Sequence, residues 1–204
     1  MKRFRNDAPN YQNTLVISSI DEPKQVDNSS ENFNNNYYFY SEVDSNSACR
    51  LAKEFGTINY GIDGYKQAFD FDSGHINLHI QSQGGDMFAG LGIVDIVLAS
   101  KYPVYSYIEG CAASAATLFS VAAKKRFIGK NSFVLIHQMS TWYGGPLDKM
   151  VEHVDNCNKF MEIIKSIYMQ YTKLPEETLD TLLSKDLWLS AKECLEYGVV
   201  DEIN

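Results

Sequence analysis

The alternation of apolar and polar residues is sharpest in the middle of the chain, from residue 76 onward. Ile76, Leu78 and Ile80 alternate with polar side chains, which is the period of a half-buried β-strand. Glycines at 84–85 interrupt this pattern, and the apolar segment 87–99 that follows predicts a helix. Further along, the pattern predicts a strand over 103–108, a helix over 112–123, a strand over 133–136, a long helix over 147–172 and a shorter helix from Glu176.

The order of these elements is strand, helix, strand, helix, and this alternation predicts an α/β fold with a largely parallel sheet. Upstream, the aromatic run 37–40 predicts a first strand. Polar residues at 44–47 offer N-caps for a helix over 48–55, and Gly56 is predicted to end that helix. We interpret residues 57–74 as a loop or as an extension of the helix.

Residues 1–36 differ from the rest of the chain in being rich in Asn, Asp and Ser. Their apolar patch, 14–17, is predicted to form a short strand. Such low hydrophobicity is typical of a segment that stays flexible unless it docks on a partner. We therefore divide the chain into a polar, flexible N-terminal segment (1–36) and one folded domain (37–204).

Composition excludes several classes of function. The formal net charge of −8 argues against a nucleic-acid surface, because phosphate contacts need clustered Lys and Arg. The short basic cluster 124–126 is interpreted as a solvated loop or the start of a strand. No apolar stretch reaches the ~18 residues that a membrane span needs, and no secretory signal is visible. We expect a soluble cytoplasmic protein (host-cell cytoplasm if the source is viral) that binds neither nucleic acid nor membrane.

The four cysteines are spread widely, as Cys49, Cys111, Cys157 and Cys194, with no CxxC pair among them. A zinc site needs closer ligand spacing, and a small disulfide scaffold needs a higher cysteine density. We expect free thiols and no metal or organic cofactor.

Three places in the chain carry residues that a packed core does not require. Gly84 and Gly85 lie between a strand and a helix, where glycine amides can approach developing negative charge. Ser114 stands among small residues near a helix start, and His137 ends an apolar strand. Each has a structural alternative: a turn, a helix cap or a hydrogen-bonded core histidine. Together they are the oxyanion donors, nucleophile and base that acyl transfer needs.

Four segments resemble signatures of the Clp protease proteolytic subunit family and occur in the family's order. They are 110–117 for the serine signature, 134–138 for the histidine signature, 83–85 where the family has Pro-Gly-Gly, and 186–191 running on to 196–201 for the C-terminal pattern. The resemblance covers roughly residues 37–204. It implies the α/β fold shared by Clp proteases and crotonases, with a largely parallel sheet, flanking helices and a long handle helix from residue 147.

The resemblance also implies a role for each matching position. Ser114 would be the nucleophile, His137 the general base and Asp186 the group that orients the imidazole. The backbone amides of Gly85 and Ala115 would form the oxyanion hole. The implied protein is a serine endopeptidase of unfolded polypeptides or peptides, and 37–204 is its catalytic domain. It would form a heptameric ring, with stacking into a double ring through the handle.

Some positions depart from the family's pattern. Gln83 replaces a proline, Met139 follows the histidine signature where proline is usual, and Glu109 stands where an apolar residue is expected. The Glu109 carboxylate either disturbs His137 or faces solvent, and we favour solvent. Asp201 is a rival to Asp186, but its place matches a structural position of the family.

Residues 1–36 lack the axial-pore segment and first helix of the family, so an AAA+ unfoldase partner does not follow from the resemblance. Two other functions stay open. The first is a non-catalytic subunit of a Clp-like ring, although such a subunit usually loses a triad residue. The second is a crotonase-type acyl-CoA enzyme, which shares the fold and a similar oxyanion hole.

Overall fold

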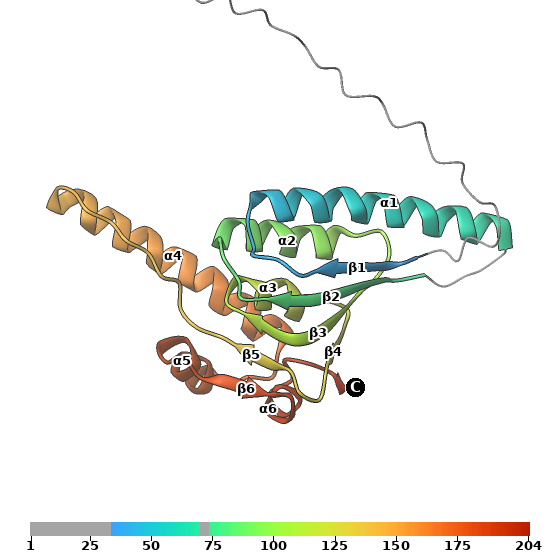
Figure 1. Cartoon of the computed structure of the whole chain (residues 1–204). Coiled ribbons are helices and arrows are strands. Elements are labelled where there is room, and N and C mark those ends of the chain that lie inside the picture. The colour runs from blue at the N-terminus through green and yellow to red at the C-terminus, as the bar shows by residue number, and fades with distance from the viewer. Residues whose placement is uncertain (1–33, 70–73) are drawn as a thin grey trace, which may run out of the picture. The chain divides into compact units, whose positions relative to one another are not determined.

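The computed structural model describes residues 34–69 and 74–204, which are coloured in Figure 1. The strand predicted over 14–17 lies outside the described residues, and the division of the chain at residue 36 stays a prediction. The described helices are α1 (Ser45–Phe69), α2 (Met87–Ala99), α3 (Ala115–Val121), α4 (Leu147–Tyr171), α5 (Glu176–Ser184) and α6 (Ala191–Glu196). The described strands are β1 (Asn36–Phe39), β2 (Ile76–Ser82), β3 (Val104–Ala113), β4 (Lys125–Ile128), β5 (Phe133–Leu135), β6 (Trp188–Ser190) and β7 (Glu202–Ile203).

These strands form one sheet whose main path runs β1-β2-β3-β4-β7, with every neighbouring pair parallel. β5 lies off this path, parallel to β3, and β6 pairs with β5 in the antiparallel direction. In Figure 1, α1 and α2 lie together on one side of β1 and β2, and α4 projects beyond the sheet. The predicted α/β fold with a largely parallel sheet, flanking helices and a long helix is confirmed.

The strand and helix predicted around the glycine pair are confirmed closely. Ile76, Leu78 and Ile80 of β2 are fully buried, as their alternation with polar residues indicated. α2 has the predicted bounds, because the Asp86 side chain caps its first turn by accepting a hydrogen bond from the Ala89 amide at 2.7 Å.

The end predicted for the first helix is wrong. The cap is present, since the Ser47 amide donates to Asp44 Oδ1 at 2.6 Å, but α1 continues through Gly56 to Phe69. Phe55, Ile58 and Ile62 recur at helical spacing and are all buried. Gly56 is exposed, so it costs the helix only about 1 kcal/mol, which is less than the burial of this apolar face contributes.

The boundary between the second predicted strand and its helix is also shifted. β3 runs to Ala113 instead of residue 108, because residues 111–113 pair with β5. α3 accordingly begins at Ala115 instead of residue 112. Ser114 is therefore the single residue between a strand and a helix.

Short elements were missed or left open by the sequence patterns. β4 begins at Lys125, so the basic cluster 124–126 is the start of a strand. β6, β7 and α6 were not predicted, because two or three strand residues, or one and a half helical turns, carry too little periodicity. α6 has a local signal, a capping box in which Ser190 and Glu193 exchange hydrogen bonds.

Candidate active site

Ser114 has a strained backbone. Its φ of 54° and ψ of −129° make it the one non-glycine residue with positive φ in the described part of the chain. It holds the N-cap position of α3, but its side chain makes no capping hydrogen bond, so the helix-cap explanation is wrong. Its amide donates to the carbonyl of Leu135 at 2.9 Å. Strain of this kind persists only where the surroundings impose it, and it is common at active sites.

The glycine pair packs between this serine and Val43. At Gly84 (φ 92°) a Cβ would lie 2.6 Å from Ser114 Cβ, and at Gly85 (φ 146°) it would lie 2.3 Å from the Val43 carbonyl oxygen. The Val43 amide holds the turn by donating to the Gly84 carbonyl at 2.8 Å. A side chain at Gly84 would push the turn away from Ser114, and one at Gly85 would push it away from Val43, so glycine is required at both for close approach as well as for its conformation.

Gly85, Ser114, Ala115 and His137 all line one cavity of about 320 Å³. Ser114 and His137 are both partly exposed. The apolar part of the wall comes from Met87, Phe88, Leu118, Met139, Ile164 and Tyr168. Amides in the first turn of a helix are not used by the helix itself, so the Ala115 N–H is free to serve a ligand. The tertiary structure thus brings four of the five predicted site residues together.

The sheet register explains why His137 is close to Ser114. Ala113 of β3 pairs with Leu135 of β5, so the residues that follow these two leave the same edge of the sheet. The segment after β5 is held by a hydrogen bond of 2.9 Å from the Gln138 amide to the Leu183 carbonyl.

Asp186 shares a cavity with His137 but not with Ser114. It shares with His137 a second cavity of about 300 Å³ and does not line the first. Leu135 pairs with Trp188 in the antiparallel direction, so the segments that carry His137 and Asp186 both lie just beyond this pair, one after β5 and one before β6. His137 therefore lines both cavities.

The three side chains are not linked by hydrogen bonds in this structure. Within residues 34–69 and 74–204, no hydrogen bond joins Ser114 to His137 or His137 to Asp186. Asp186 is also exposed. Catalytic hydrogen bonds are often long in an unliganded site and shorten when substrate binds.

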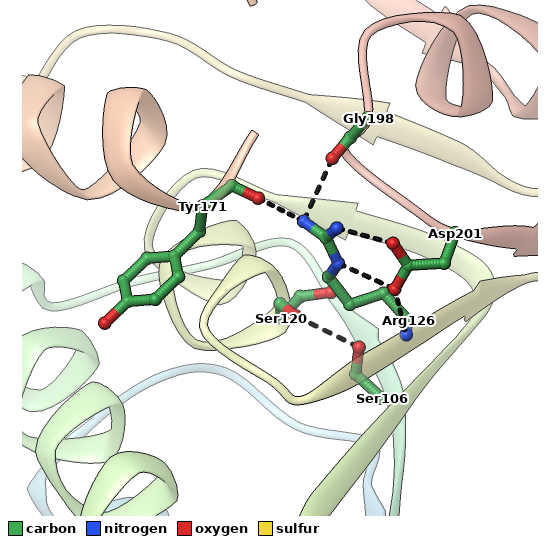
Figure 2. Close-up of polar contacts among 6 residues, drawn as sticks. All are labelled: Ser106, Ser120, Arg126, Tyr171, Gly198 and Asp201. Atoms are coloured by element: carbon green, nitrogen blue, oxygen red, sulfur yellow. Dashed lines mark hydrogen bonds and ion pairs between the residues drawn. The ribbon is translucent and has the colours of Figure 1, made fainter. Parts of the chain in front are cut away.

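The rival carboxylate, Asp201, has a structural partner. It accepts hydrogen bonds from Arg126 Nε at 3.0 Å and Nη2 at 2.6 Å, and Arg126 also donates to the carbonyls of Gly198 and Tyr171 (Figure 2). Burial raises the pKa of Asp201, but the bonds from Arg126 outweigh it and leave the pKa below its usual value. Asp201 lines neither cavity of His137. Its bonds to Arg126 join the C-terminal segment to β4, and Arg126 in turn joins both to the end of α4.

Glu109 is also away from the candidate site. It accepts a hydrogen bond from the Tyr40 hydroxyl, and His79 Nδ1 lies 2.9 Å from its other oxygen. Burial raises the pKa of Glu109, but the hydrogen bonds with Tyr40 and His79 outweigh burial, so the pKa lies below its usual value. The hydrogen bond between Tyr40 and Glu109 also raises the pKa of the Tyr40 hydroxyl to about 12. Glu109 faces solvent in part, as we favoured, and it lines neither cavity of His137.

Three contacts near the site were missed from the sequence. The Thr117 hydroxyl donates to the Ser114 carbonyl at 2.6 Å and lies 2.5 Å from the Tyr168 hydroxyl. The Met139 amide, which proline would lack, lies 3.4 Å from Met161 Sδ. A threonine three residues after a serine near a predicted helix start is a weak local signal for the first contact, but nothing local points to the partners on α4.

The described residues contain no group of three or more His, Cys, Asp or Glu side chains arranged to hold a metal ion. In the same part of the chain, no helix has the length and apolar character to cross a membrane.

Comparisons with known proteins agree with this geometry. The sequence model of the Clp protease family matches residues 69–204. The ATP-dependent Clp protease proteolytic subunit 2 of Treponema denticola is 35% identical over 130 residues, which is 63% of this chain and 65% of the relative. The corresponding subunit of Deinococcus radiodurans is 31% identical over 130 residues, or 63% of this chain and 64% of the relative. The chain thus spans just under two thirds of each relative.

The fold comparison gives the same family. A mutant of ClpP1 from Listeria monocytogenes superposes with a TM-score of 0.71 at 25% sequence identity. The match covers 83% of this chain and 91% of that one.

Proposed function

The chain belongs to the Clp protease family, and from this premise we propose that it is a serine endopeptidase that acts on unfolded polypeptides or peptides. In this proposal Ser114 is the nucleophile, His137 the general base and Asp186 the carboxylate that orients the imidazole. The observation that supports it most is the shared cavity of about 320 Å³, which both Ser114 and His137 line beside the amides of Gly85 and Ala115.

The proposed reaction is acyl transfer through a covalent intermediate. Ser114 Oγ attacks the scissile carbonyl while His137 takes its proton. The N–H groups of Gly85 and Ala115 donate to the oxyanion as the carbonyl becomes tetrahedral. His137 then returns the proton to the leaving amine, and a water molecule activated by the same imidazole hydrolyses the acyl-enzyme.

The cavity wall suggests which substrate side chains fit. Met87, Leu118 and Ile164 make part of the wall apolar, so an apolar residue next to the scissile bond would gain from burial there. The substrates are proposed to be extended chains, since the family relatives are named as proteolytic subunits. A ring of seven copies, stacked as a double ring, and a cytoplasmic location belong to the same proposal. An AAA+ unfoldase does not follow from it.

One observation favours a second candidate, a non-catalytic ring subunit. In the described residues, His137 is hydrogen-bonded to neither Ser114 nor Asp186, and a site that stays in this state does not activate its serine. The two candidates differ in the reactivity of Ser114 alone, so a test of that reactivity separates them.

The test is labelling of the purified full chain with a fluorophosphonate probe, followed by mapping of the adduct by mass spectrometry. We expect the adduct on Ser114 and not on Ser140, which lines the same cavity. Ser114→Ala should abolish labelling and peptide hydrolysis while the oligomer, measured by sedimentation, is unchanged. An assembled wild-type chain that takes no label would favour the non-catalytic subunit.

A further inference from the structure

The carbonyl of Ser114 is held by one residue of α3. The Thr117 hydroxyl donates to it at 2.6 Å, and the Thr117 amide donates to it at 3.0 Å. On the other side of Ser114, its own amide donates to the Leu135 carbonyl at 2.9 Å. Both peptide groups that flank the strained φ of 54° are therefore fixed by hydrogen bonds.

The donor in the hydrogen bond between the Thr117 and Tyr168 hydroxyls follows from the single proton that each hydroxyl carries. A carbonyl can only accept, so the single hydroxyl proton of Thr117 is committed to Ser114. The Tyr168 hydroxyl lies 2.5 Å from Thr117 Oγ1, and it must then be the donor in that pair. The order of donation is thus Tyr168 to Thr117 to Ser114, which connects α4 to the backbone of the proposed nucleophile.

Thr117 and Tyr168 are both buried, where the loss of a hydrogen bond costs the most free energy. Both Thr117 and Tyr168 are 1% exposed. Water cannot replace a lost partner there, so removing one hydroxyl leaves the other unsatisfied. Burial also raises the pKa of Tyr168, and its hydroxyl stays protonated and able to donate throughout the neutral range.

We propose that Thr117 and Tyr168 are positioning residues that hold the Ser114 backbone in its left-handed conformation and so aim the serine hydroxyl into the cavity. This inference rests on the proposed function, in which Ser114 is the nucleophile. A residue in this conformation costs about 1–3 kcal/mol, and contacts on both sides of it must offset that cost. Thr117 supplies the contact on the carbonyl side, and Tyr168 fixes the rotamer of Thr117.

The experiment compares four single variants of the full chain, and the Thr117→Val/Tyr168→Phe double variant, with the wild type. Thr117→Val removes the hydroxyl at nearly constant volume, and Thr117→Ser restores it. Tyr168→Phe removes only the tyrosine hydroxyl and keeps the ring in the cavity wall. Tyr171→Phe is the matched control, one helical turn along α4, where the hydroxyl accepts from the exposed Gln170 side chain. The measurements are the rate of fluorophosphonate labelling at Ser114, kcat and KM for peptides, and the melting temperature.

We expect Thr117→Val to slow labelling by about tenfold, since it loses the bond to the Ser114 carbonyl and the bond from Tyr168, and Tyr168→Phe by about threefold, since it loses only the second of these. Thr117→Ser should stay within about twofold of the wild type, as should Tyr171→Phe. The Thr117→Val/Tyr168→Phe double variant should be no slower than Thr117→Val, because both changes interrupt one chain of bonds. The loss should appear in kcat with KM unchanged.

Each other outcome overturns the inference in a recognisable way. Unchanged labelling in Thr117→Val and Tyr168→Phe, at a lower melting temperature, would mean that the pair only stabilises the fold. A change in the preference among peptides, with labelling unchanged, would make Tyr168 a substrate contact instead. If the wild-type chain shows no Ser114-dependent labelling, the proposed function fails and this inference fails with it.

Discussion

The Ser114 amide donates a hydrogen bond of 2.9 Å to the carbonyl of Leu135, two residues before His137. This bond continues the parallel ladder between β3 and β5 by one residue. The proposed nucleophile is therefore fixed directly to the end of β5, two residues before the proposed base. The relative position of the two groups depends on sheet register, which is set by the buried faces of the strands and tolerates little slippage.

Gly84→Ala should inactivate the site. The new Cβ would lie 2.6 Å from Ser114 Cβ, and the φ of 92° disfavours any L side chain. We expect the Ser114 labelling rate to fall by at least about a hundredfold, because a displacement near 1 Å is enough for such a loss. The measurement is labelling kinetics on protein whose folding is checked by circular dichroism. Full activity in Gly84→Ala would contradict the close approach of this turn to the serine.

Gly56→Ala should have the opposite effect on stability. Gly56 lies inside α1, is exposed, and an added Cβ would meet nothing within 4 Å. Alanine in a helix interior is favoured over glycine by roughly 0.5–1 kcal/mol, so the free energy of unfolding should rise by that amount. Denaturant unfolding measures it. A decrease would mean that residue 56 ends the helix, as the sequence pattern suggested.

Asp186→Asn should lower kcat with little effect on the melting temperature. Asp186 is exposed and lines a cavity with His137, and in the proposed triad its carboxylate orients the imidazole and stabilises its protonated form. We expect at least about a hundredfold loss in peptide hydrolysis. Asp201→Asn is the matched control, since Asp201 lines neither cavity of His137, and it should lower stability while the activity of the folded protein is retained. A reversal of these two results would make Asp201 the third catalytic residue.

The bonds between Arg126 and Asp201 should make stability depend on pH in the acid range. The pKa of Asp201 is lowered in the folded chain, whereas an aspartate in the unfolded chain has a pKa of about 3.9. At pH values near and below about 3.9 the unfolded chain therefore binds more protons than the folded chain. The stabilisation is present above the unfolded pKa and is lost as pH falls through the folded one. The difference in melting temperature between wild type and Asp201→Asn should therefore shrink between pH 5 and pH 3. A difference independent of pH would show that the pair acts only through packing.

Much of the fold was predictable because its patterns are local. The alternation around Ile76 and the capping Asp86 each act within a few residues, so the sequence located β2 and α2 closely. The end of α1 was predicted wrongly at Gly56. A glycine ends a helix only when no buried apolar face continues beyond the glycine, and here Ile58 and Ile62 continue the buried face of α1. The start of α3 was misplaced because pairing with β5, a contact distant in sequence, extends β3 to Ala113.

The sequence by itself determined the α/β class and the identity of the candidate residues, because strand and helix periods and the motifs around Ser114, His137 and Asp186 can be recognised without coordinates. Only the tertiary structure decided which residues and cavities lie next to these candidate residues. It separated Asp201, which Arg126 binds, from Asp186, which lines a cavity together with His137, and it brought Tyr168 to Thr117 across 51 residues of chain. The physical reason is that hydrogen bonds between distant elements depend on sheet register and helix packing, which no short segment specifies.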